Sequence, residues 1–278
     1  MKKNNVQIAS EALMPFVEAM KEIDKKAEEY QQIREEEREA VMDNVWKMWI
    51  ESSQIDKRID EEFVDWQERV WQILCFGYRN EDRFYHSFDH IVDCLHKFKL
   101  IKDKIKYPKA FELAIWFHDI IYNPLSKNNE DESANLAYNL IYEIDKELAV
   151  RVKELVLFTK WDSSWFLDGS VGKLYKTHGC DFETLNEDFL YLRDIDWSGF
   201  GMDWDYYCSN TEDICRESPY MDYETFCRKR IGFLEWLKVL QDNYRPLYST
   251  EFFSDMLTER ANQNINRELE LLKEKIKK

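Results

Sequence analysis

Four of the five histidines, His86, His90, His96 and His118, fall within a window of 33 residues. His118 is followed directly by Asp119, inside the apolar stretch FELAIWFHDIIY. An unpaired charge buried in such a stretch costs several kcal/mol or shifts its pKa until the group is neutral. A metal ion satisfies an imidazole and a carboxylate together, so this pair predicts a metal site.

Nearby histidines and a distant pair of aspartates can complete the ligand set. His86 and His90 are four residues apart, so on a helix they share a face, whereas at a helix start only the second needs to point inward. Asp194 and Asp196 end another apolar segment and are both candidates for a further carboxylate ligand. Imidazoles and carboxylates suit Zn, Mn, Fe, Ni or Co, and no thiolate lies within reach by sequence to force a structural zinc site.

The elements that must position these residues are predicted to be helices. Only 7 Gly and 5 Pro occur among 278 residues, which leaves little room for the turns of an all-β fold. Apolar residues recur at helical spacing instead, with Gly77 and Pro124 placed to end two of the helices. We expect an all-α fold of about nine helices, among them 60–78, 86–100, 111–122, a helix capped by Asn128 or Asn129, 147–159, 183–195, 222–241 and 251–275.

The N-terminal region differs from the rest of the chain. Residues 1–60 contain two short apolar stripes separated by a highly charged run. This pattern predicts a helical N-terminal extension or arm, which offers a route to a homo-oligomer, before a main domain over residues 61–278.

Composition excludes several classes of protein. The net charge of −16, from 39 basic and 55 acidic residues, makes a nucleic-acid binder unlikely, since such binding depends on Lys and Arg. No run approaches about 18 apolar residues, and Glu11 and Glu18 interrupt the start of the chain, so we expect no membrane span or signal peptide and a cytoplasmic location. The six cysteines include no CxxC pair and are interpreted as reduced thiols.

The order of these residues resembles the HD superfamily of metal-dependent phosphohydrolases, and within it a bacterial branch of predicted phosphohydrolases. The resemblance spans about residues 63–272 and rests on YRNEDRFYHSFDHI (78–91), AIWFHDIIYNP (114–124), the NExxSA pattern (129–134), the DID segment (194–196), and Arg230, Glu259, Ala261 and Asn264. Two features depart from the family: Asp162 replaces the histidine of a Thr-x-x-His motif, and the segment 214–218 matches its IRxEY-like motif only in part.

The resemblance implies an HD-domain-like helical bundle that holds one divalent metal ion. The candidate metals are Mn, Co, Ni, Zn, Fe and Mg. Its metal ligands are implied to be His90, His118, Asp119 and, of the two aspartates, Asp196, because an apolar residue usually precedes the ligand. The implied activity is hydrolysis of a phosphate ester, with a nucleotide among the candidate substrates, by metal-activated water.

The resemblance also implies catalytic roles for neighbouring residues. Asp119 or Glu130 is expected to orient or deprotonate the attacking water. His86 is expected near the substrate phosphate, and Arg83 is a candidate phosphate clamp because its planar fork matches phosphate oxygens.

Two alternatives to a phosphohydrolase stay open. A di-iron oxygenase needs more imidazoles than His86, His96 and His178 supply, which makes it the weaker alternative. The stronger alternative is a catalytically inactive helical binding or scaffold protein that retains the HD fold.

Overall fold

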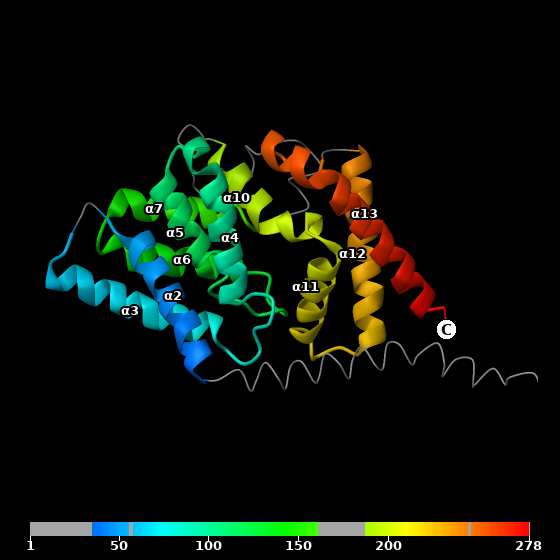
Figure 1. Ribbon diagram of the computed structural model, residues 1–278, viewed down its shortest axis with the longest axis horizontal. Helices are drawn as coiled ribbons and strands as arrows, with labels where there is room; N and C mark the ends of the chain where they lie inside the picture. Colours follow the sequence, from blue (N-terminus) through cyan, green and yellow to red (C-terminus); the bar gives the residue numbers. More distant parts are fainter. Residues whose placement is uncertain (1–34, 56–57, 161–186, 244–245, 278) are drawn as a thin grey trace, which may run out of the picture. The chain divides into compact units, whose positions relative to one another are not determined.

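The computed structural model describes residues 35–55, 58–160, 187–243 and 246–277, and every regular element in these ranges is a helix (Figure 1). The prediction of an all-α fold is confirmed. The helices are α2 (Glu35–Ser53), α3 (Glu61–Tyr78), α4 (Phe88–Ile101), η1 (Lys102–Lys104), α5 (Pro108–Phe117), α6 (Asn129–Tyr142), α7 (Lys146–Leu157), α10 (Asp188–Asp196), η2 (Trp197–Gly201), α11 (Trp204–Arg216), α12 (Tyr223–Asn243) and α13 (Glu251–Lys275).

The chain divides into two compact units, Met1–Glu51 and Ser52–Lys278. The described part of the first unit belongs to α2, and residues 1–34 of the predicted N-terminal arm lie outside the described residues. All helices from α3 to α13 belong to the second unit. Among the described helices, none combines the length and apolar character that a membrane crossing requires.

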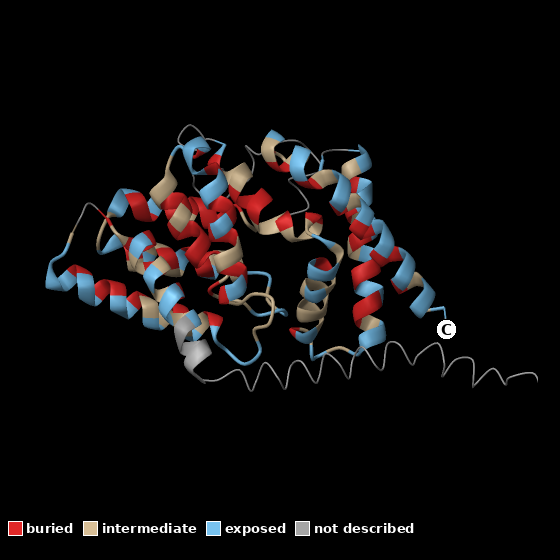
Figure 2. Ribbon diagram, viewed as in Figure 1, coloured by how far each residue is buried: buried red, intermediate tan, exposed pale blue. Residues whose placement is uncertain are grey.

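Helix α5 forms the centre of the core of the second unit. Seven of its ten residues are buried, namely Ala110, Phe111, Leu113, Ala114, Ile115, Trp116 and Phe117. It packs against α4, α6, α7 and α10, and Figure 2 shows that these helices carry many buried residues. The apolar composition of α5 accounts for this position, because a helix that is hydrophobic on all sides is stable only when it is covered on all sides.

The predicted helix over residues 111–122 is too long, because α5 ends at Phe117. Continuing the helix would pair the carbonyl of Asp119 with the N–H of Asn123. In the structure that carbonyl accepts from Arg83, and the N–H of Asn123 donates to the side chain of Asn129. The His118–Asp119 pair therefore lies at the end of a buried helix rather than within it, and Pro124 has no part in stopping it.

Gly77 allows a close approach instead of ending a helix. It lies inside α3, and the cap residue Arg79 has a φ of −105°, so no left-handed glycine cap terminates the helix. A Cβ atom at Gly77 would lie 2.8 Å from the carbonyl oxygen of Ile120. The glycine thus lets α3 lie directly against the segment that follows Asp119.

Helix α11 is absent from the helices expected from the sequence. Tyr207 is its one buried residue, and Asp203 caps its first turn by accepting from the N–H of Tyr206. Its apolar and polar residues nevertheless separate at helical spacing, so the sequence did carry a signal for this helix.

The segment around η2 is attached closely to α13. A Cβ atom at Gly201 would lie 2.6 Å from the Cβ of Leu257, so only glycine permits this contact. The side-chain amide of Asn264 donates to the carbonyls of Phe200 and Met202 at 2.9 and 2.8 Å. These contacts fix the position of η2, and with it the end of α10.

Candidate metal centre

His90 is placed by the first turn of α4. The helix starts at Phe88 and buries Ile91, Leu95 and Phe98, which fixes its rotation against the core. His90 itself is 7% exposed. His86 precedes the helix, so the two histidines do not share a helical face, and only His90 points inward as a residue of α4.

His118 and Asp119 reach the same point from the end of α5. The Nδ1 atom of His118 lies 2.8 Å from the carbonyl oxygen of Ile115, so it is the protonated ring nitrogen. Nε2 is therefore the nitrogen that can present a lone pair to a metal ion, and it lies 3.2 Å from Nε2 of His90 and 3.1 Å from Oδ2 of Asp119.

Asp196, at the last residue of α10, is the aspartate that joins this cluster. Its Oδ1 lies 3.2 Å from Nε2 of His90 and 3.6 Å from Nε2 of His118. Asp194 serves a different purpose, because its fully buried carboxylate accepts from the N–H groups of Ser249 and Thr250 at the start of α13.

The four side chains can hold a metal ion. One nitrogen or oxygen atom from each of His90, His118, Asp119 and Asp196 lies within 4.8 Å of the other three. An ion about 2.0–2.2 Å from each ligand atom places neighbouring ligands roughly 3.0–3.6 Å apart. The five separations given by the structure, 3.1, 3.2, 3.2, 3.6 and 3.7 Å, lie in or close to that range. The two Nε2 atoms, which face each other at 3.2 Å, also need a cation or a proton between them.

The charges of the cluster favour a cation. Burial would lower the pKa of His118, but Asp119 and Asp196 raise that pKa well above its usual value of 6.5. Burial would likewise raise the pKa of both aspartates, yet the adjacent histidines lower it below the usual 3.8. The two carboxylates are therefore ionised, and a divalent ion can replace the imidazole proton and balance both of them.

Cys94 lies closer to the cluster than the sequence reasoning allowed. Its Sγ is 3.7 Å from Nε2 of His90, one helical turn earlier on α4. Burial raises the pKa of the Cys94 thiol far above its usual range, and its sulfur is not among the ligand atoms that converge within 4.8 Å of one another. The donor set remains two imidazoles and two carboxylates, which suits Mn, Fe, Co, Ni or Zn.

Arg83 holds the segment that follows α5. Its guanidinium donates to the carbonyls of His86, Asp119 and Ile120 at 3.0, 2.6 and 2.7 Å, and it lies over the ring of Tyr122. These contacts favour a positioning role for Arg83 over the predicted phosphate clamp.

His86 is oriented by Glu217, a residue to which the sequence reasoning gave no role. The His86 Nδ1 lies 2.6 Å from Oε2 of Glu217, and the imidazole stacks on Tyr122 at 3.8 Å between ring centroids. Glu217 belongs to the segment 214–218 that matches the family motif only in part. Its signal in the sequence was a single glutamate at the end of a helix that was itself not predicted.

Glu130 lies in the first turn of α6, where burial and the charge of Asp119 raise its pKa above the usual 4.5. Asp162 and His178 are outside the described residues, so the altered Thr-x-x-His position has no structural description.

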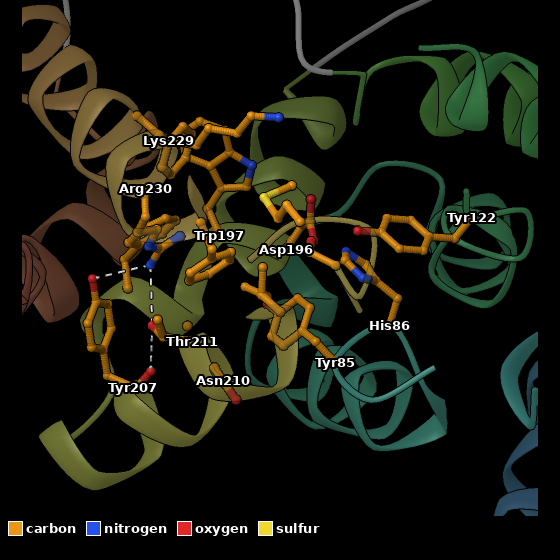
Figure 3. Close-up of a pocket in the computed structure, with 17 residues that line it drawn as sticks. Tyr85, His86, Tyr122, Asp196, Trp197, Tyr207, Asn210, Thr211, Lys229 and Arg230 are labelled. Atoms are coloured by element: carbon orange, nitrogen blue, oxygen red, sulfur yellow. Dashed lines mark hydrogen bonds between the residues drawn. The ribbon is translucent and has the colours of Figure 1, made fainter. Parts of the chain in front are cut away.

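A cavity of about 500 Å³ adjoins the cluster (Figure 3). Asp196 and His86 line it, so one predicted metal ligand and the predicted phosphate-binding residue share one space. Its walls are mainly aromatic, from Tyr85, Tyr122, Trp197, Phe200, Tyr207 and Phe233. The volume lies within the range of small-molecule sites.

Comparison with known proteins adds no assignment: the chain matches no protein-family model, no curated protein and no solved structure. The fold and the cluster therefore define an all-α protein with a candidate metal centre.

Proposed function

We propose that this protein is a metal-dependent phosphohydrolase of the HD superfamily, which cleaves a phosphate ester with metal-activated water. The observation that carries the proposal is the convergence of His90, His118, Asp119 and Asp196 on one point. The order of these ligands along the chain matches the order in that superfamily. The adjoining cavity supports the proposal because Asp196 is common to both features.

A divalent ion bound by these four residues would supply Lewis acidity and lower the pKa of a water. Two nearby carboxylates can then take up the proton from that water. Asp119 has a lowered pKa and is the weaker base, whereas the pKa of Glu130 is raised by burial and by Asp119. Glu130 is therefore better matched to accept a proton near neutral pH.

His86 is suited to act on the substrate. Its Nδ1 is held by Glu217, so Nε2 is the nitrogen left to contact a ligand in the cavity. A carboxylate bonded to one nitrogen fixes the orientation of the ring, so the other nitrogen can exchange a proton with the leaving oxygen or a hydrogen bond with the phosphate.

Metal analysis of the purified full-length chain tests the first half of the proposal. We expect wild type to bind Mn²⁺, Co²⁺, Ni²⁺ or Zn²⁺ at about one ion per chain, and His90→Ala to lose that binding. His96→Ala is a matched control, because His96 lies on the same helix but is exposed. A wild-type protein that binds none of these ions overturns the proposal.

A panel of phosphomonoesters, nucleotides and cyclic nucleotides tests the second half. Turnover that is present in wild type and in His96→Ala, but absent in His90→Ala, supports a phosphohydrolase. Bound metal without turnover on any phosphate ester overturns the enzymatic proposal and favours the alternative, a binding protein that retains the metal.

A further inference from the structure

The cavity has a second polar region on the side away from His86. Figure 3 shows Arg230, Tyr207 and Thr211 on one side of the cavity and His86 and Tyr122 on the other. The first group comes from α11 and α12, and neither helix supplies any of the four candidate ligands. The region needs an explanation of its own, because neither metal binding nor the proposed hydrolysis uses it.

Arg230 is buried there, with a side chain only 9% exposed. Its Nε and Nη2 atoms donate to the two carboxylate oxygens of Glu268 at 3.0 and 3.1 Å. Nη2 also lies 3.4 Å from the hydroxyl of Tyr207 and 3.3 Å from that of Thr211. Replacing a buried ion pair with apolar residues is often neutral or stabilising, so the pair is poorly explained by stability alone.

One part of the guanidinium of Arg230 is left for a ligand. Its Nη1 atom has no hydrogen-bond partner among the described residues, although the side chain lines the cavity. The guanidinium stays charged at any physiological pH, so Nη1 offers two N–H donors that favour an anionic acceptor.

Lys229 adds a positive charge beside Arg230. It also lines the cavity, and in the described part of the chain no acidic side chain pairs with it. Glu268 balances Arg230, so Lys229 leaves this region with a net positive charge in a protein whose overall charge is −16.

We propose that Arg230 and Lys229 bind a second anionic group of the substrate. This inference rests on the proposed function, since it assumes that the first anionic group, the phosphate, lies beside the candidate metal ligands. The aromatic rings of Trp197, Phe200 and Phe233 line the space as well, and they suit an apolar or planar body between the two anions. The substrate class is therefore a phosphate ester of a largely apolar or planar compound that carries a carboxylate or a second phosphate.

The test uses arylphosphonates, which cannot be hydrolysed, and the Mn²⁺-loaded full-length protein. One set carries a carboxylate at graded distances from the phosphorus, and each member is paired with its neutral carboxamide. A second set carries a second phosphonate in place of the carboxylate. Titration calorimetry gives the ratio of dissociation constants within each pair, and comparison of the two sets shows which second anion is preferred.

We expect the anionic member to bind at least about 10-fold more tightly than the carboxamide at one spacing. Lys229→Gln should reduce this ratio at least about threefold. Lys238→Gln is the matched control, since Lys238 is an exposed lysine on the same helix that does not line the cavity. This control should leave the ratio unchanged.

Arg230 is tested without leaving Glu268 charged and unpaired. The double variant Arg230→Met with Glu268→Gln should bring the ratio close to 1, whereas Glu268→Gln alone should preserve it. Thermal unfolding verifies that each variant is folded. If the double variant does not fold, the binding ratio of Lys229→Gln tests the inference.

The outcomes separate this inference from the proposed function. Phosphonates that bind without any preference for a second anion overturn the inference and leave the hydrolase proposal in place. A preference that survives Lys229→Gln also overturns it. If no phosphonate binds to the Mn²⁺-loaded protein, the proposed function and the inference that rests on it both fail.

Discussion

The imidazole Nδ1 of His86 lies 2.6 Å from Oε2 of Glu217, a residue 131 positions later in the chain. The other carboxylate oxygen, Oε1, accepts from the main-chain N–H groups of Phe84, Tyr85 and His86 at 2.8, 2.9 and 2.9 Å. One buried carboxylate thus fixes both the ring of His86 and the backbone leading into α4. Because Glu217 directly follows α11, this contact connects the C-terminal helices to the proposed site.

Glu217→Gln should impair turnover without removing the metal. The amide has one acceptor oxygen where the carboxylate has two, so it cannot hold both the main-chain N–H groups and Nδ1 of His86, and we expect kcat to fall about 10- to 100-fold. Metal content should match that of wild type. Steady-state kinetics and metal analysis check both results, and loss of the ion would show that Glu217 supports the metal ligands instead.

The contribution of Glu217 to stability should depend on pH. Burial would raise its pKa, but the bonds from His86 and the main chain lower it below the usual 4.5. An acid with a lowered folded-state pKa stabilises the fold above its unfolded pKa, and this contribution is lost as the pH falls through the folded value. The free energy of unfolding of Glu217→Gln should be about 1–3 kcal/mol below wild type at pH 7. Urea unfolding should show a smaller difference at pH 4, and a difference that grows on acidification would contradict the assignment.

Metal ions should stabilise the folded protein. A ligand that binds only the folded state at 100 times its Kd adds about 2.7 kcal/mol. We expect Mn²⁺ or Zn²⁺ to raise the Tm of wild type and a chelator to reverse the change. Asp196→Asn should show no such shift. Asp194→Asn should keep the shift but start from a lower Tm, because Asp194 holds the start of α13.

Gly77→Ala should destabilise the protein and weaken metal binding. The new Cβ would lie 2.8 Å from the Ile120 carbonyl, so α3 and the segment after Asp119 must move apart. Overpacking of this kind costs about 1–3 kcal/mol. Gly232→Ala is the matched control, because nothing lies within 4 Å of a Cβ there, and it should stabilise α12 by about 0.5–1 kcal/mol. Chemical unfolding and metal titration measure both effects, and a neutral Gly77→Ala would refute the close-approach argument.

Arg83→Lys distinguishes a positioning residue from a phosphate clamp. A lysine keeps the charge but lacks the planar guanidinium that donates to the three carbonyls. The segment that carries Asp119 is then held less firmly, so we expect metal affinity to fall about 10- to 100-fold. A phosphate clamp predicts the reverse pattern, with normal metal affinity and a raised KM. Metal titration together with kinetics separates the two patterns.

Much of the fold could be predicted from the sequence, because its helices bury broad apolar faces. The expected helices over 222–241 and 251–275 correspond closely to α12 and α13. The end of α5 could not be predicted, because the carbonyl of Trp116 accepts from the hydroxyl of Tyr78, 38 residues away, instead of from the next turn of a longer helix. Such a contact leaves no periodicity in the local sequence.

The residues of the candidate site also include some that could be predicted from the sequence and some that could not. His118 and Asp119 were conspicuous because charged and polar groups are costly inside an apolar helix. The choice of Asp196 as a ligand followed from the resemblance, and the structure brings this residue to the two histidines. Glu217 contacts His86, 131 residues away, and Arg230 donates to Glu268, 38 residues away. Only the tertiary structure brings these pairs together.

The carboxylate of Asp194 ties the end of α10 to the start of α13, two residues before the candidate ligand Asp196. The last helix is consequently not a dispensable tail for anyone who shortens this protein for expression or crystallisation. A chain that stops before Ser249 leaves the buried Asp194 charge without its main-chain donors and frees η2 from its support. Fragments intended to retain the metal centre should therefore keep α13 whole.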